Sequence, residues 1–170
     1  MTDDVSDDDA FVRFVDARWG QLVRSGVLLG CSEPEAQDLA QSTLTRCYQA
    51  WSKVEQARDR DAYVFRILIN TLAKSRKRRW WGEVPVEELP EVRSADDPAS
   101  VVATRSAVQQ ALAKLSIDHR AVLVLRFFAD LSEQQTAEVL GVATGTVKSR
   151  TARALEQLSL DTTLNELLQS

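Results

Sequence analysis

The sequence contains few of the residues from which metal, redox and nucleophilic sites are built. His119 is its only histidine, and its two cysteines, Cys31 and Cys47, lie far apart without a CxxC spacing or a histidine nearby. Zinc and dithiol centres need closer sets of ligands, so we expect both cysteines to be small, buried apolar residues. No glycine-rich phosphate loop, paired-carboxylate motif or nucleophile motif occurs either. These gaps argue against an enzyme and predict no metal and no cofactor.

Long apolar runs are also missing, and residues that break helices are scarce. No run approaches the roughly 18 to 20 apolar residues that span a membrane, and the acidic N-terminus has the wrong charge for a secretory signal. We therefore expect a cytoplasmic protein that does not enter a membrane. Only four prolines and six glycines occur in 170 residues. Together with apolar residues that recur at helical spacing, they predict an all-α chain of two small domains.

Charge is distributed unevenly along the chain. The formal net charge of −4 argues by itself against a polyanionic partner, but the location of charge matters more than its sum. Acids are concentrated in residues 1–9, which we expect to form a disordered tail, and again in Glu83–Asp97. Cations gather in Lys74–Arg79 and in Lys148–Arg153. Two separate basic segments predict two contacts with one long partner.

Helical periodicity predicts a first domain over residues 10–81. Ala10–Leu29 is expected to form one core helix or a pair of helices. A second helix is expected over Glu33–Val54, with Ser32 as its cap and Pro34 in its first turn.

The helix expected over Glu33–Val54 has a polar side that includes Asp38 and Gln41. This side is either plain surface or a docking site for a partner helix, and periodicity alone favours plain surface. The highly charged segment Ser52–Asp61 lacks an apolar period, so we expect a loop or a frayed turn there.

A basic helix is expected over Ala62–Arg79. Trp80 and Trp81 follow it directly. A basic stripe that ends in exposed aromatic rings can bind phosphates and stack unpaired bases, at ~1 to 3 kcal/mol per base. The alternative, in which both tryptophans anchor the core, has equal support. The polar stripe comprises Arg66, Asn70, Lys74, Lys77 and Arg78.

Prolines and acids without a helical stripe indicate a flexible acidic linker over 82–103. The second domain is expected over 104–158 as four short helices around one core, with Ser116 capping the helix that carries His119. Residues 159–170 form a C-terminal extension whose leucines, by hypothesis, pack between the domains and hold them closed. The expected core of the second domain includes Val108, Leu112, Leu115, Val122, Leu123, Leu125, Phe127 and Phe128.

Residues 131–158 predict a helix, a glycine turn and a second helix rich in cations. Ser132 and Gln135 form a capping box, Gly141 supplies the turn, and Thr144 is expected to cap the second helix. No acid occurs between Val139 and Leu155, as a DNA recognition helix requires near phosphates. An ordinary helical hairpin with a solvated basic face is the alternative. Val147, Ala154, Leu155 and Leu158 are expected to face inward, and Lys148, Ser149, Arg150, Ala152 and Arg153 outward.

Three stretches in this order resemble a known family. AQDLAQSTLTRCYQAW resembles its polymerase-docking region, YVFRILINTLAKSRKRRW its minus-ten region and VATGTVKSRTARAL its minus-35 recognition helix. The chain resembles extracytoplasmic-function sigma factors of the sigma-70 family over Phe11–Leu158. The stretch RKRRWWGEVP is similar to an actinobacterial, sigma-E-like subgroup. This resemblance implies sigma region 2, a linker and sigma region 4.

The resemblance implies roles for individual residues. It places Asp38, Gln41 and Ser42 at the docking site for core RNA polymerase, which replaces the plain-surface interpretation. The segment Ser52–Asp61 corresponds to the part that captures a flipped non-template base. The implied minus-ten contacts are Asn70, Lys74, Lys77, Arg78 and Trp80. The implied minus-35 contacts are Thr144, Thr146, Lys148, Ser149, Arg150 and Arg153.

The family further implies the partners. They are core RNA polymerase, through its beta-prime clamp helices and beta flap, promoter DNA, and an anti-sigma factor that restrains a chain which is monomeric when free. The implied function is transcription initiation at specific promoters. Two other functions remain as alternatives: a stand-alone helix-turn-helix regulator, which would normally dimerise, and a helical adaptor whose basic patches meet acidic proteins.

Overall fold

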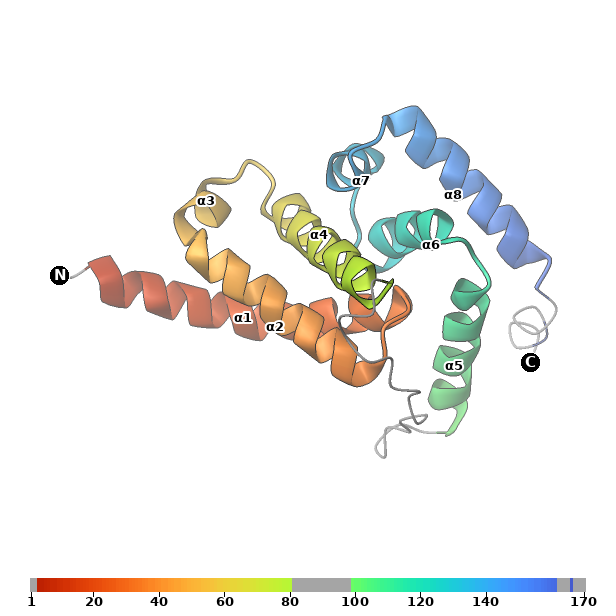
Figure 1. Cartoon of the computed structure of the whole chain (residues 1–170), viewed down its shortest axis with the longest axis horizontal. Helices are drawn as coiled ribbons and strands as arrows, with labels where there is room; N and C mark the ends of the chain where they lie inside the picture. The colour runs from red at the N-terminus through yellow and green to blue at the C-terminus, as the bar shows by residue number, and fades with distance from the viewer. Residues whose placement is uncertain (1–2, 81–98, 162–165, 167–170) are drawn as a thin grey trace.

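The structure is a computed structural model that describes residues 3–80, 99–161 and 166. Every regular element in these ranges is a helix, which confirms the all-α class. The helices fall into two groups that correspond to the two expected domains (Figure 1). The expected linker lies mostly outside the described residues, and its last five positions, 99–103, already belong to a helix.

Four helices form the first domain: α1 (Asp3–Leu28), α2 (Glu33–Gln49), α3 (Trp51–Gln56) and α4 (Arg60–Trp80). Both α1 and α4 pack against α2. Their apolar stripes meet because each helix places its large aliphatic and aromatic side chains on one side. The buried side chains include Leu22, Leu39, Leu44, Val54, Phe65 and Leu68.

The start of α2 has the capping box expected from the sequence motif. The Ser32 hydroxyl accepts a hydrogen bond from the Glu35 backbone N–H at 3.2 Å, and the Glu35 carboxylate accepts one from the Ser32 N–H at 2.8 Å. Pro34 lies in the first turn, as expected, where its missing N–H has no cost.

The expectation of a disordered acidic tail is wrong for residues 3–9, which form the first turns of α1. Acidic side chains stabilise the positive end of a helix dipole. The Tyr48 hydroxyl also donates a hydrogen bond to Asp8 at 3.1 Å, which ties this end of α1 to α2.

The single helix expected over Glu33–Val54 is interrupted at Ala50, where φ is −119° and ψ is 29°. Beyond this break α3 runs to Gln56, so most of the loop expected over Ser52–Asp61 is helical or belongs to the start of α4. Burial of Trp51 accompanies the break. Its ring lies 5.1 Å from those of both Phe11 and Phe14, measured between centroids.

The second domain consists of α5 (Ala99–Ala113), α6 (Ile117–Leu123), a π-helical turn η1 (Val124–Phe128), α7 (Glu133–Leu140) and α8 (Thr144–Ser159). Ser116 caps α6 as expected, and its hydroxyl accepts a hydrogen bond from the His119 N–H at 3.2 Å. The buried side chains include Leu112, Leu115, Val122, Leu123, Leu125, Leu131, Val139 and Val147.

The expected inward orientation of Phe127 and Phe128 is wrong, because their exposed fractions are 56% and 46%. The chain between α6 and α7 forms a wider turn, in which the Ala129 N–H donates to the Val124 carbonyl at 2.9 Å. Such a π turn advances the helix by one extra residue per hydrogen bond and rotates the following side chains.

The two domains pack directly against each other. α7 lies on α4 (Figure 1). In addition, α1 contacts α5 and η1. The buried apolar side chains of both domains belong to one continuous cluster. The described part of the C-terminal extension contacts its own domain, through an ion pair of 2.7 Å between Lys114 and Asp161. The expected packing of its leucines between the domains is wrong for Leu160, which is 77% exposed. The other leucines, at 164, 167 and 168, lie outside the described residues.

Candidate nucleic-acid interface

One side of α2 is formed by exposed polar side chains. Successive residues of a helix are rotated by about 100°, so these positions share an arc of roughly that width. Leu39, Ala40 and Cys47 lie on the opposite side and are buried. The helix therefore presents one carboxylate and two amides to a partner on a rigid support. We call these five residues the α2 face: Asp38, Gln41, Ser42, Thr45 and Gln49.

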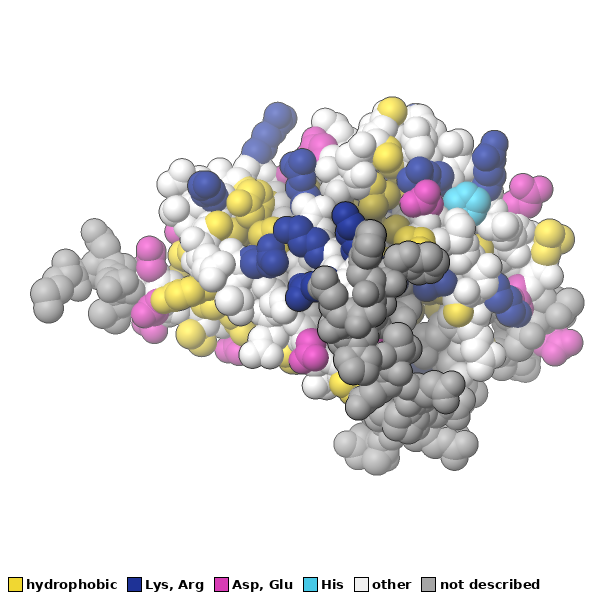
Figure 2. Space-filling model, in the orientation of Figure 1, with side chains coloured by type: hydrophobic (Ala, Val, Ile, Leu, Met, Phe, Trp, Pro, Cys, Tyr) yellow, Lys and Arg dark blue, Asp and Glu magenta, His cyan; other side chains and the backbone are white. Residues whose placement is uncertain are grey.

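The outer side of α4 carries the expected polar stripe. All five of its members are exposed, namely Arg66, Asn70, Lys74, Lys77 and Arg78. Phe65, Leu68 and Leu72 on the inner side are buried. Figure 2 shows Lys and Arg side chains gathered over α4 in the middle of the visible face. The backbone of Trp80 ends α4, but its side chain and the whole of Trp81 lie outside the described residues.

The helix-turn-helix has the geometry expected from its sequence. The Ser132 hydroxyl accepts from the Gln135 N–H at 3.0 Å, and the Gln135 side-chain oxygen accepts from the Ser132 N–H at 2.6 Å. Gly141 adopts φ 65° and ψ 37°, the left-handed conformation that ends α7. The cap of α8 is Ala143 rather than the expected Thr144, because Ala143 is the last residue with extended backbone.

The outer side of α8 presents three of the expected DNA contacts, Lys148, Ser149 and Arg153, all of which are exposed. Thr144 is exposed as well, while Thr146 and Arg150 are half-buried at the edge of this side. Val147 and Ala154 are buried as expected.

Two residues of α8 that we expected to face inward are not fully buried. Leu155 is 45% exposed, contrary to the expectation, and Leu158 is only half-buried. Leu155 lies about 80° around the helix from Val147, at the edge of the packed side.

Two cations of α8 form ion pairs that the sequence motif did not reveal. Arg150 lies 3.3 Å from the Asp118 carboxylate of α6, and Lys148 lies 3.7 Å from the Glu133 carboxylate of α7. The pairs are partly exposed, and such pairs contribute at most about 1 kcal/mol. Phosphates can therefore replace the carboxylates at little cost.

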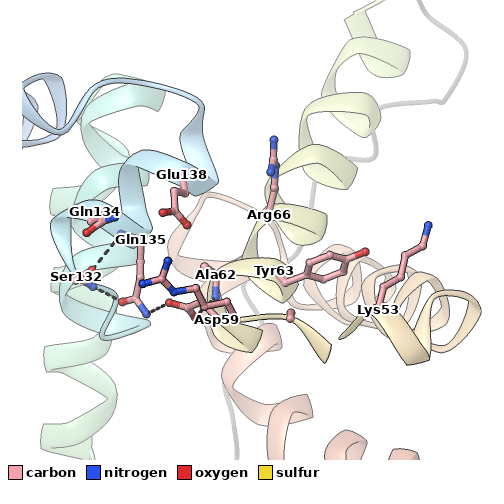
Figure 3. Close-up of a pocket in the computed structure, with 11 residues that line it drawn as sticks. Lys53, Asp59, Ala62, Tyr63, Arg66, Ser132, Gln134, Gln135 and Glu138 are labelled. Atoms are coloured by element: carbon pink, nitrogen blue, oxygen red, sulfur yellow. Dashed lines mark hydrogen bonds between the residues drawn. The ribbon is translucent and has the colours of Figure 1, made fainter. Parts of the chain in front are cut away.

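A cavity of about 580 Å³ lies between the domains, and Figure 3 shows its lining. The turn before α4 and the first turns of that helix form one side, with Arg58, Asp59 and Arg66; α7 forms the other, with Gln135 and Glu138. The Asp59 carboxylate accepts hydrogen bonds from the Ala62 backbone N–H at 3.0 Å and from the Gln135 amide. The Ala62 N–H and then the Gln135 amide hold the pKa of Asp59 below its ordinary value of 3.8, although desolvation opposes them.

The sequence matches two family models. Residues 13–82 match sigma-70 region 2 and residues 105–158 match sigma-70 region 4. The RNA polymerase sigma-E factor of Streptomyces coelicolor is 39% identical over 148 residues, which cover 87% of this chain and 83% of the relative. The chain belongs to the sigma-70 family of RNA polymerase sigma factors. Such proteins are transcription factors rather than catalysts, and this sigma factor functions in promoter-directed initiation of transcription.

A second relative extends the match to the extracytoplasmic-function group. The ECF RNA polymerase sigma factor SigL of Mycobacterium tuberculosis is 35% identical over 151 residues, which cover 86% of this chain and 84% of that protein. These similarities confirm the resemblance that the three sequence stretches carry. As a sigma factor, the chain has core RNA polymerase and promoter DNA as its partners.

Two solved structures share the fold. The sigma factor RpoE of Bartonella quintana, in complex with the anti-sigma factor NepR, has a TM-score of 0.73 at 24% identity and covers 94% of this chain and 97% of its own. CnrH in complex with the cytosolic domain of CnrY has a TM-score of 0.68 at 25% identity, covering 89% and 86%.

Region 2 of this sigma factor comprises most of α1 together with α2–α4, and region 4 comprises most of α5 through α8. The α2 face and the α4 stripe therefore lie in region 2, whereas helix α8 lies in region 4. Sequence reasoning missed the residues that connect the regions. Asp59 has no local motif that points to α7, and the capping box gives Gln135 a role within its own helix only.

The two cysteines of the sigma factor differ in their burial. Cys47 is buried, and burial raises the pKa of its thiol to about 11, which keeps it protonated. Cys31 is only half-buried, in contrast to the expectation. No set of three potential metal-binding side chains occurs among the described residues, and none of the described helices is long and apolar enough to cross a membrane.

Proposed function

We propose that this sigma factor docks on the beta-prime clamp helices of core RNA polymerase through the α2 face, with Asp38, Gln41 and Ser42 in contact. The observation that supports this role is their joint exposure on one side of a helix whose other side is buried. A rigid helix with a fixed set of donors and acceptors loses little entropy when a partner helix binds.

In the same proposal the α4 stripe contacts the minus-ten element. Lys74, Lys77 and Arg78 pair with phosphates, Asn70 hydrogen-bonds to bases, and Trp80 stacks on an unpaired base. The exposure and charge of the stripe support the first two roles. The turn before α4 captures the flipped base, a step whose cost of a few kcal/mol is offset by contacts in a pocket.

The recognition helix α8 contacts the minus-35 element, while the beta flap of polymerase holds region 4. Lys148, Ser149 and Arg153 face the bases, and Arg150 exchanges its carboxylate partner for a phosphate. Thr144 and Thr146 lie at the start of the helix, where backbone N–H groups favour anions.

The number of cations on α8 sets the strength of this contact. Even if all three of its cations contacted phosphates, the salt slope would be near −0.9 × 3, or about −2.7, which is small for an autonomous DNA-binding protein. Region 4 therefore does not hold a promoter alone. Attachment of both regions to polymerase raises their effective concentration at the DNA. This dependence favours a chain that is a monomer in the cytoplasm when free, rather than a self-sufficient dimeric regulator.

An anti-sigma factor is the proposed restraint on this chain. The supporting observation comes from two structures of the same fold. RpoE was solved in complex with the anti-sigma factor NepR, and CnrH in complex with the cytosolic domain of CnrY.

The test of the docking role is co-elution of the purified chain with core RNA polymerase in gel filtration. We expect the wild type to co-elute and the double variant Asp38→Ala, Gln41→Ala to elute separately. The matched control is Asp16→Ala with Gln110→Ala, which removes the same two kinds of side chain from exposed sites on α1 and α5. Equal co-elution of all three proteins contradicts the proposed contacts.

A second experiment separates the sigma-factor interpretation from an adaptor that binds acidic proteins. Substitution of Lys148 and Arg153 by glutamine is expected to abolish run-off transcription from promoters found with the wild type, because both cations face the bases. Transcription that survives both changes intact contradicts the assignment of α8 to the minus-35 element.

A further inference from the structure

One side chain connects the first helical turns of two helices from different domains. The Gln135 amide uses its oxygen to accept from the Ser132 N–H at the start of α7, and its nitrogen to donate to Asp59 at the start of α4. Asp59 in turn caps α4 through the Ala62 N–H. Figure 3 shows this chain of hydrogen bonds at the edge of the cavity. Gln135 and Asp59 each cap their own helix, so they can form the hydrogen bond between the domains without any change in either helix.

A second connection lies at the C-terminal end of α1. The Arg120 guanidinium of α6 donates to the carbonyls of Leu112, Ala113 and Leu115 in its own domain at 2.9 to 3.2 Å. Its remaining nitrogen donates at 3.3 Å to the Leu29 carbonyl of the first domain.

The Leu29 carbonyl also accepts from Arg76 of α4, so two cations share one acceptor. Burial and the charge of Arg76 lower the pKa of Arg120. The adjacent Gly30 has φ 102°, and a Cβ there would overlap the Arg120 guanidinium. The absence of a side chain at Gly30 thus permits the close approach of the two domains.

This closed arrangement does not fit a promoter. Minus-ten and minus-35 elements are about two and a half helical turns apart, or roughly 80 to 90 Å, whereas here α7 packs on α4. The 18 residues between α4 and α5, 81–98, reach at most ~65 Å. Together with the width of the domains, this length suffices only if the two regions separate. In addition, the Gln135 side chain of α7 occupies the Asp59 carboxylate, which lies in the turn that our proposed function assigns to base capture.

We propose that the Gln135–Asp59 bridge, supported by Arg120 on the Leu29 carbonyl, is a latch that keeps the free chain closed and occupies the Asp59 carboxylate of its base-capturing turn. Only the consequence for base capture rests on the proposed function. The latch has a low cost of release, because Asp59 and Gln135 both keep their helix-capping partners when the domains separate.

The variant Gln135→Glu tests the latch without loss of the capping box, because a glutamate at this position accepts from the Ser132 N–H equally well. Its second oxygen then faces the Asp59 carboxylate, and two carboxylates repel. A hydrogen bond to a charged group is lost, so the open-to-closed ratio should rise about ten- to hundredfold. Gln135→Ala removes the bridge without added charge, and Ser132 still caps α7 through its hydroxyl.

Small-angle X-ray scattering of the free chain supplies the readout. A compact chain of this length has a radius of gyration of about 16 Å, and separated domains increase it by several ångströms. We expect a compact wild type, an expanded Gln135→Glu variant and an intermediate Gln135→Ala variant. Gln110→Glu, which places the same charge change on the exposed side of α5, should stay compact. Circular dichroism should show equal helix content in all four proteins.

Exchange of the two partners provides the rescue. When Asp59→Asn is combined with Gln135→Glu, the oxygen of the introduced amide still caps α4 and its nitrogen donates to the introduced carboxylate, so the double variant should be compact again. A radius of gyration that is the same in wild type and both Gln135 variants overturns the latch, and so does an expanded wild type. Because neither polymerase nor DNA is present, the result is independent of the docking experiment.

Discussion

The two glycines that flank the start of the recognition helix should respond in opposite directions to alanine. An added Cβ meets no atom within 4 Å at either Gly141 or Gly145, so steric clash contributes nothing at either site. Gly145 lies inside α8, where alanine is favoured over glycine by up to about 1 kcal/mol. Gly141 has φ 65°, where a side chain strains the backbone and alanine costs about 1 kcal/mol. The difference between the stability changes of the two variants therefore reports the backbone conformation at these positions.

Thermal unfolding of the two variants measures this difference. For a domain of 60 to 100 residues, 1 kcal/mol corresponds to about 4 to 8 °C in Tm, so Gly145→Ala should melt higher and Gly141→Ala lower than the wild type. Equal shifts of one sign would refute the left-handed turn between α7 and α8. Gly145 also lies on the side of α8 assigned to DNA. Because the variant is expected to be more stable, any loss of promoter binding reports contact with DNA rather than unfolding.

Three further predictions concern packing, pH and salt. Gly26→Ala should lower the free energy of unfolding in urea by about 1 to 3 kcal/mol, because its Cβ would lie 3.0 Å from the Ala36 Cβ across the α1–α2 contact. The lowered pKa of Asp59 means that its carboxylate stabilises the fold above 3.8 and loses this contribution as the pH falls through the lowered pKa; Asp59→Asn should flatten the acid limb of a stability curve. Arg150→Gln should reduce the salt slope of holoenzyme binding to promoter DNA by about 0.9, measured by fluorescence anisotropy. An unchanged slope would mean that Arg150 does not contact a phosphate.

Features that depend on a few adjacent residues could be predicted from the sequence. Ser32 and Ser132 each have a partner three positions later, and both capping boxes occur in the structure. Gly141 is followed by the second helix because left-handed backbone is favourable for glycine. The outward positions of α8 likewise follow from helical spacing, which required no knowledge of what packs behind them.

Features that depend on distant residues could not be predicted. Ala50 has no helix-breaking chemistry, and α2 ends there because the chain turns to bury Trp51 among rings from α1. Arg150 pairs with Asp118, which precedes it by 32 positions. Hydrophobicity alone predicts burial of Phe127, but the π turn that contains this residue rotates its ring outward.

The closed arrangement has a quantitative consequence for polymerase binding. The α2 face is exposed while the domains touch. In the proposed function, however, polymerase holds both regions at once on the two promoter elements, which requires them to be apart. If the open form alone binds at both sites, the apparent Kd equals the intrinsic Kd divided by the open fraction. Gln135→Glu should then tighten binding of core polymerase by the same factor by which it raises the open fraction in scattering. Titration of labelled polymerase measures the first factor. Equal affinities of wild type and variant, despite different radii of gyration, would show that polymerase binds the closed chain and opens it afterwards.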